Sequence, residues 1–263
     1  MTYEQILYSA DGEVGVITLN RPERMNAWTH VMCDELTDAI SACNQDPGIG
    51  AMVITGAGRG FCAGADIKQN FQARIEGQDP ERTGQNSANW VSLLRSSKPI
   101  VAAVNGASVG VGLTMILPFD VIIASEAARF AMAFIKMGLV PELASSHFLV
   151  QRMGFGRASE MCLSGRMYDA AEAHAAGLVD RVAKPEELLD TALEMARSFA
   201  ANPTPQLRWV KQLLTENGSA TDLTQVQKRE GELLQEAYQS PEHKEAVAAF
   251  LEKRPADFRK LTG

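Results

Sequence analysis

Apolar and polar positions alternate along the chain in blocks that switch between strand-like and helical spacing. Residues 6–20 (ILYSADGEVGVITLN) are typical of two strands joined by a turn at Asp11 and Gly12. Residues 29–45 follow with apolar positions at helical spacing, and Pro47 ends that segment. The predicted apolar face of this helix consists of Val31, Leu36, Ala39, Ile40 and Cys43.

Three continuously apolar runs predict strands that are buried on both faces. They are residues 51–56 (AMVITG), 99–104 (PIVAAV) and 120–125 (DVIIAS). Glycine-rich and helical segments separate them, and after Pro141 the periodicity predicts helices only, the clearest at 185–201 and 203–215. We therefore expect an α/β chain with a largely parallel sheet, covered by C-terminal helices.

Composition narrows the class of protein. The chain has 263 residues, of which 46% are apolar, so it can bury a sizeable core as one large domain or two small ones. No stretch approaches the roughly 20 apolar residues that span a bilayer. The N-terminal segment carries acids where a signal peptide has a basic flank, and the four cysteines show no CxxC spacing. We expect a cytoplasmic protein that does not enter a membrane.

The net charge and the spacing of the histidines argue against nucleic acid and metal ions as ligands. A net charge of −7 disfavours nucleic acid, which is bound by neutralising its phosphates, although a small polyanion needs only a local cationic patch. The four histidines are scattered without HxxxH or HxH spacing, so we expect no metal site.

The first glycine-rich segment, ITGAGRGFCAG, follows a predicted strand. It lacks the G-x-G-x-x-G spacing of a dinucleotide-binding loop and the Lys-Ser/Thr pair of a P-loop. What remains is a loop whose backbone can approach a ligand closely and direct amide N–H groups toward it.

The second glycine-rich segment contains Gly106, Ser108 and Gly110 in G-x-S-x-G order between a strand and a helix. This is the context of a serine-hydrolase nucleophile, although small residues are equally expected where a helix packs closely on a strand. Acid and base candidates follow in the required order at Asp169, His174, Glu186 and His243. Both interpretations remain open at this point.

A third segment, KMGLVPELASS, places Glu142 behind Pro141 in an apolar run. One interpretation is a residue of a first helical turn, where proline and glutamate are both favoured. The other is a proton carrier, because apolar neighbours that exclude water raise the pKa of a carboxyl group toward the useful range. The expected neighbours are Phe134, Ile135, Met137, Leu139, Val140 and Leu143.

Six segments together resemble the crotonase superfamily, the enoyl-CoA hydratase/isomerase family, in order and spacing over nearly the whole chain. They are VITLNRPERMNAW, GRGFCAGADI, PIVAAVNGASVGVGL, DVIIASEAARFAM, GLVPE and AAEAHAAGLVDRVA. The resemblance implies an α/β crotonase-like spiral of ββα units over residues 1–200. It also implies a C-terminal helical region over 201–263 that packs homotrimers or dimers of trimers.

The family binds acyl-CoA thioesters and stabilises the thioester oxygen with two backbone N–H groups. By position these belong to Ala65 and Val111, where valine stands at a place that is usually glycine. The resemblance implies coenzyme A contacts as well, with coenzyme A entering as part of the substrate and no separate cofactor. These contacts would come from Arg24, Ala63, Ala65, Asp66, Ile67, Lys68, Val111, Phe250 and Lys253.

Family hydratases add water with two glutamates, whose positions are occupied here by Thr114 and Phe134. The family's Δ3,Δ2-enoyl-CoA isomerases use one glutamate in a PE pair, which corresponds to Glu142. The resemblance therefore favours an isomerase that converts 3-enoyl-CoA to trans-2-enoyl-CoA. The alternatives are a hydratase or another crotonase-type enzyme, a serine hydrolase using Ser108, and a non-catalytic acyl-CoA-binding homologue.

Overall fold

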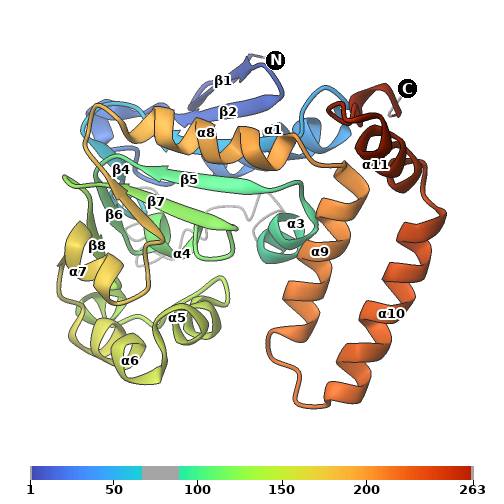
Figure 1. The fold of residues 1–263 in the computed structure, drawn as a ribbon. Helices are drawn as coiled ribbons and strands as arrows, with labels where there is room; N and C mark the ends of the chain where they lie inside the picture. The colour runs from blue at the N-terminus through green and yellow to red at the C-terminus, as the bar shows by residue number, and fades with distance from the viewer. Residues whose placement is uncertain (1, 67–88, 262–263) are drawn as a thin grey trace.

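A six-stranded sheet forms the centre of the protein (Figure 1). The computed structural model describes residues 2–66 and 89–261. The strand order is β1-β2-β3-β5-β7-β10, antiparallel between β1 and β2 and parallel from β2 onward. Its strands are β1 (Ile6–Asp11), β2 (Val14–Leu19), β3 (Ala51–Gly56), β5 (Ile100–Val104), β7 (Val121–Ser125) and β10 (Arg181–Ala183).

A second sheet of four short strands runs in the order β4-β6-β8-β9. Its strands are β4 (Gly60–Cys62), β6 (Ala107–Val109), β8 (Arg129–Ala131) and β9 (Tyr168–Asp169). Three successive passages of the chain each place one strand in the large sheet and the next in the small sheet: β3 then β4, β5 then β6, β7 then β8. The chain therefore winds as a spiral, and corresponding loops stack along one edge.

Helices cover both faces of the large sheet. Alternate strand residues such as Val53 and Val101 face α8 (Leu188–Ala200), which lies across one face in Figure 1. Their neighbours, including Met52 and Ile54, face the main core with α1 (His30–Gln45). The remaining elements of the core region are η1 (Pro22–Arg24), α3 (Trp90–Ser96), α4 (Val111–Thr114), η4 (Ala133–Met137), α5 (Ser145–Met153), α6 (Phe155–Ser164) and α7 (Ala170–Ala175).

The C-terminal helices stand to one side of the sheets (Figure 1). They are α9 (Thr204–Asn217), α10 (Leu223–Gln239), α11 (Pro241–Glu252) and the short η5 (Arg259–Leu261). Lys211 anchors α9 to the core, because its buried Nζ donates to Asp120 Oδ2 at 2.8 Å. No residue of α10 is buried. The division at residue 200, where α8 ends, stays a prediction.

The structure confirms the α/β class, the parallel sheet and the spiral, and it corrects three details. The chain is not wholly helical after Pro141, because β9 and β10 join the two sheets there. The two glycine-rich segments are not simple loops, since they contain β4 and β6. Val31 is 43% exposed, and Met32 and Cys33 take its place on the buried face of α1. No helix in the described ranges is long and apolar enough to cross a membrane.

Candidate active site

Pairing between β4 and β6 brings the two glycine-rich segments together. Cys62 of β4 pairs in parallel with Ser108 of β6, so the chain leaves both strands at the same edge of the small sheet. A side chain at Gly112 would collide with the carbonyl oxygen of Cys62 at 2.1 Å. Only glycine allows α4 to pack this closely on β4, and the segments that follow the two strands are therefore neighbours.

Ala65 and Val111 follow these two strands, Ala65 after β4 and Val111 after β6. Trp28 N–H donates to Gly64 O at 2.8 Å and Asp66 N–H donates to Trp28 O at 3.0 Å, so the intervening Ala65 N–H points away from this bridge. Val111 is the first residue of α4, where the N–H groups of a helix have no partner within the helix. Gly110 takes the positive φ of +55°, and Val111 does not, so valine keeps an unstrained backbone here.

Glu142 does not lie in a first helical turn. The helix α5 begins at Ser145, and Glu142 precedes it by one turn of chain, with its carbonyl accepting from Ser145 N–H at 3.0 Å. The helix-start interpretation is therefore wrong. Its Oε1 lies 3.4 Å from Thr114 Oγ1, which is fully buried on α4.

The apolar residues expected around Glu142 do not enclose it within a single chain. Ile135, Met137, Leu139 and Val140 are exposed, and Glu142 is itself an exposed residue. Ile135 and Met137 belong to η4, a 3-10 helix with no buried residue, and Leu139 and Val140 follow it in an exposed segment. The prediction that these neighbours exclude water from Glu142 is therefore wrong for the four exposed residues. Phe134 and Leu143 are half-buried and pack against the core.

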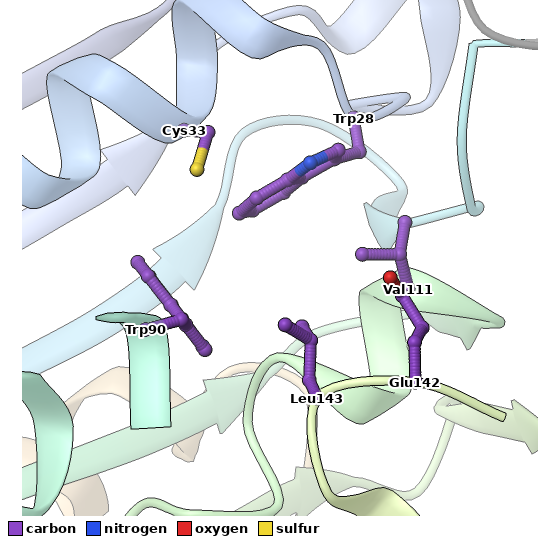
Figure 2. Close-up of a pocket in the computed structure, with 6 residues that line it drawn as sticks. All are labelled: Trp28, Cys33, Trp90, Val111, Glu142 and Leu143. Carbon is purple, nitrogen blue, oxygen red and sulfur yellow. The ribbon is translucent and has the colours of Figure 1, made fainter. Parts of the chain in front are cut away.

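A small cavity of about 30 Å³ lies beside the Glu142 carboxylate. Figure 2 shows its walls, with Glu142 next to Val111 and two tryptophan rings opposite. The lining residues are Trp28, Cys33, Trp90, Val111, Glu142 and Leu143. Burial, followed by the negative charge of Asp34, raises the pKa of the Cys33 thiol to about 12, so the thiol is neutral near pH 7.

The two tryptophans and Cys33 were not predicted as site residues. The chain has three tryptophans, and two of them meet edge to face here, with ring centroids 5.8 Å apart and an interplanar angle of 84°. Trp28 ends the NAW segment, which was the one available signal. Trp90 gave no sequence signal for a site residue, because a tryptophan on an apolar helix is more often a core residue.

The segment after Glu142 has an unusual backbone. Leu143 and Ala144 have φ of +54° and +55°, in the left-handed region. This conformation costs about 1–2 kcal/mol per residue that carries a Cβ. The structure holds two such residues in succession, directly after the carboxylate.

Apart from Val111, which lines the cavity, the predicted coenzyme A contacts fall into three groups. Arg24, Ala63 and Asp66 lie together, because Ala63 N–H donates to Met25 O at 3.0 Å and the following residues form the bridge to Trp28. Asp66 also pairs with Arg21 at 3.2 Å.

Ile67 and Lys68, the second group, lie outside the described residues. Phe250 and Lys253 form the third group and are not brought to Glu142 within one chain. They lie at the end of α11, across the molecule from α4 in Figure 1, and Phe250 is 83% exposed.

The residues proposed for a serine hydrolase do not assemble. Ser108 is fully buried and its Oγ donates to Gly112 O at 2.9 Å. Asp169 caps α7 through Glu172 N–H, and His174 Nδ1 lies 2.9 Å from Val179 O. Each of these side chains serves a separate local contact, and the remaining candidates, Glu186 and His243, are exposed. Within the described ranges there is also no cluster of three His, Cys, Asp or Glu residues able to hold a metal ion.

Known proteins resemble this chain over nearly its whole length. Residues 9–261 match the family model for enoyl-CoA hydratase/isomerase. The chain is 36% identical to a probable enoyl-CoA hydratase of Rhizobium meliloti, with 98% of this chain and 99% of the relative covered. It is 35% identical to the 1,2-epoxyphenylacetyl-CoA isomerase of Escherichia coli, with 97% and 98% covered.

Solved structures show the same fold. A crystal structure of an enoyl-CoA hydratase from a Polaromonas species superimposes with a TM-score of 0.87 at 32% identity, covering 96% of this chain and 98% of that chain. The family model spans almost all of the described chain, and the fold matches throughout. The protein belongs to the enoyl-CoA hydratase/isomerase family, with a crotonase-type fold.

Proposed function

We propose that the protein is an enoyl-CoA isomerase that converts 3-enoyl-CoA to trans-2-enoyl-CoA with Glu142 as its proton carrier. The observation that carries this proposal is the composition of the cavity. Glu142 is the one carboxylate among the described residues that line it. Thr114 and Phe134 stand at the two positions where family hydratases carry glutamates.

A single carboxylate is sufficient for this reaction. Glu142 takes a proton from C2 of the 3-enoyl thioester, and the electron pair delocalises over the thioester oxygen and C4 as a dienolate. The same carboxyl group then returns the proton to C4, and the double bond ends between C2 and C3. No atom is gained or lost, so the reaction needs no cofactor beyond the coenzyme A of the substrate.

The backbone N–H groups of Ala65 and Val111 stabilise the dienolate oxygen in this mechanism. Two supports are the parallel β4–β6 pairing, which joins the two segments, and the position of Val111 at the start of α4 beside the cavity. A donor of this kind contributes about 3 kcal/mol to a transition state that gathers negative charge on oxygen. The coenzyme A moiety would extend over Arg24, Ala63 and Asp66.

Hydration is the second candidate, and two observations favour it. Several relatives are named enoyl-CoA hydratases, and Glu142 is exposed enough for water to reach it. Against it, water addition in the family uses a pair of carboxylates, and the hydroxyl of Thr114 at 3.4 Å from Glu142 cannot act as the second base.

The direct test is Glu142→Gln, which keeps the shape of the side chain and removes the base. Isomerisation of 3-hexenoyl-CoA should fall by about 10²–10⁴-fold, the usual contribution of a positioned general base. Affinity for a saturated acyl-CoA should change little, because the proposed coenzyme A contacts lie elsewhere. A variant that isomerises at the parent rate would return Glu142 to a structural role.

We propose further that the protein assembles as a homotrimer or a dimer of trimers and works in the cytoplasm. The support for assembly is apolar surface that one chain leaves uncovered. On α10, Leu223, Leu234 and Tyr238 are 74%, 50% and 49% exposed and share one face of the helix. The support for location is four free cysteines, typical of a reducing compartment.

A further inference from the structure

Leu143 occupies a backbone position that favours glycine, yet its side chain forms a wall of the cavity. Its φ is +54°, and the next residue, Ala144, has φ +55°. Leu143 lines the cavity, whereas Ala144 is an exposed residue that caps α5. Two neighbouring residues therefore have the same unfavourable conformation, and only one of them contributes a side chain to the site.

The wall opposite Leu143 is held in place. Trp90 is 1% exposed, and its Nε1 donates to Met115 O at 2.9 Å. Its ring meets Trp28 edge to face, and Trp28 is itself joined to Gly64 through a backbone hydrogen bond of 2.8 Å. A buried indole with a satisfied N–H cannot swing aside without losing both contacts.

The space between these walls is small, and Glu142 is the one charged residue among the described residues that line it. A cavity of about 30 Å³ holds roughly two water-sized groups. The Cys33 thiol is neutral, and the other walls are two indoles and two aliphatic side chains. Such a pocket accepts a few methylene groups beyond the reacting carbons and rejects charged or long chains.

We propose that Leu143, held in its left-handed conformation against the fixed Trp90 ring, closes the acyl pocket and restricts the substrate to short, uncharged acyl chains of about four to six carbons. This proposal rests on the proposed function, because it assigns the cavity to the acyl group. Leu143 is then a specificity-determining residue and Glu142 the catalytic one.

The test compares two matched variants, Leu143→Gly and Ala144→Gly. Each replaces one residue with positive φ by glycine, so each relieves the same kind of backbone strain in the same loop. Only Leu143→Gly removes a cavity wall. Binding of butanoyl-, hexanoyl- and decanoyl-CoA, which cannot react, is measured by calorimetry for the parent and both variants. Leu143→Ala serves as a second variant, and acetyl-CoA binding reports that each protein is folded.

The parent should bind decanoyl-CoA at least about tenfold more weakly than hexanoyl-CoA, since steric rejection in an apolar pocket is of this order. Leu143→Gly should remove most of this difference, and Ala144→Gly should leave it within about threefold. Equal affinity of the parent for all three lengths would overturn the proposal. So would an equal change in both glycine variants, which would assign the effect to backbone strain.

Turnover of 3-enoyl-CoA substrates distinguishes a failure of this proposal from a failure of the proposed function. If the parent discriminates among saturated chains but isomerises no 3-enoyl-CoA, the isomerase assignment fails and the role of Leu143 stands. If the parent isomerises 3-hexenoyl-CoA and 3-decenoyl-CoA with equal kcat/KM, the isomerase assignment stands and the role of Leu143 fails.

Discussion

The Thr114 hydroxyl and the Glu142 carboxylate approach each other from separate elements, with Oγ1 and Oε1 3.4 Å apart. Thr114 is fully buried on α4, one turn after Val111, whose carbonyl is also 3.4 Å from the same hydroxyl. A hydroxyl has one proton to donate, so Thr114 can bond to either oxygen. Thr114 therefore provides a donor that can orient the Glu142 carboxylate.

Removing the hydroxyl should change the pH dependence of the reaction. In Thr114→Val the shape is retained, but the ionised carboxylate loses a donor, and loss of such a bond raises a carboxyl pKa. The acidic limb of the kcat/KM profile should therefore move to higher pH, with kcat lowered at acidic pH. Thr114→Ser, which keeps the hydroxyl, should follow the parent. An acidic limb that does not move in Thr114→Val would assign Thr114 to packing alone.

Ser108 should be dispensable for turnover. Its Oγ is buried and donates to Gly112 O, so it supports the packing of α4 on β6. Ser108→Ala should leave acyl-CoA turnover within about threefold of the parent, because one buried hydrogen bond contributes about 1 kcal/mol. A fluorophosphonate should not label the protein. Stoichiometric labelling at Ser108 would instead favour hydrolase chemistry.

Lys98 should make stability depend on pH above neutrality. Its buried Nζ donates to Cys43 O at 2.8 Å and Asp46 O at 2.6 Å, near the end of α1. Burial lowers the Lys98 pKa to about 8 from its ordinary 10.5. The unfolded chain therefore binds more protons than the folded chain between these two values. The contribution of Lys98 to the free energy of unfolding should rise with pH across that window.

The measurement is urea unfolding of the parent and Lys98→Met at about pH 7 and about pH 9.5. The parent should gain stability relative to Lys98→Met at the higher pH. Tyrosines such as Tyr3 and Tyr8 are present in both proteins, so their contributions to the pH dependence cancel in the comparison. A relative stability that falls over this interval would contradict the expected direction.

The exposed face of α10 should mediate assembly. Sedimentation at micromolar concentration should give a trimer or hexamer for the parent, because Leu223, Leu234 and Tyr238 form an uncovered apolar stripe. Leu234→Glu should shift the protein toward monomer by placing a charge in that stripe. Lys228→Glu changes an exposed polar position of the same helix and serves as the control. A parent that sediments as a stable monomer would refute this assignment.

The central strands β3, β5 and β7 of the large sheet could be predicted, because burial on both faces leaves a direct record in the sequence. The apolar runs at 51–56, 99–104 and 120–125 became β3, β5 and β7. The strands β4, β6 and β8 have three residues each, too few for any periodicity, and glycines at the close β4–α4 contact were equally compatible with a loop.

The site was predictable where a side chain or a glycine carries the chemistry, and not where distant packing shapes it. Glu142 stood out as a carboxylate in an apolar run, but the sequence could not show that its neighbours on η4 face outward. Trp90 and Cys33 reach the cavity through the packing of α3 and α1, far from Glu142 along the chain. The positive φ of Leu143 has no sequence signal, since leucine normally avoids it.

One assay distinguishes isomerisation from hydration in the parent protein. The protein is incubated with 3-hexenoyl-CoA and, separately, with crotonyl-CoA. Conjugation of the double bond with the thioester is followed by absorbance, and the masses of the products are measured by mass spectrometry. We predict that 3-hexenoyl-CoA becomes conjugated at unchanged mass and that crotonyl-CoA remains largely unhydrated, because Glu142 is the one carboxylate among the described residues that line the cavity. Efficient conversion of crotonyl-CoA to a product heavier by one water, without conjugation of 3-hexenoyl-CoA, would contradict it.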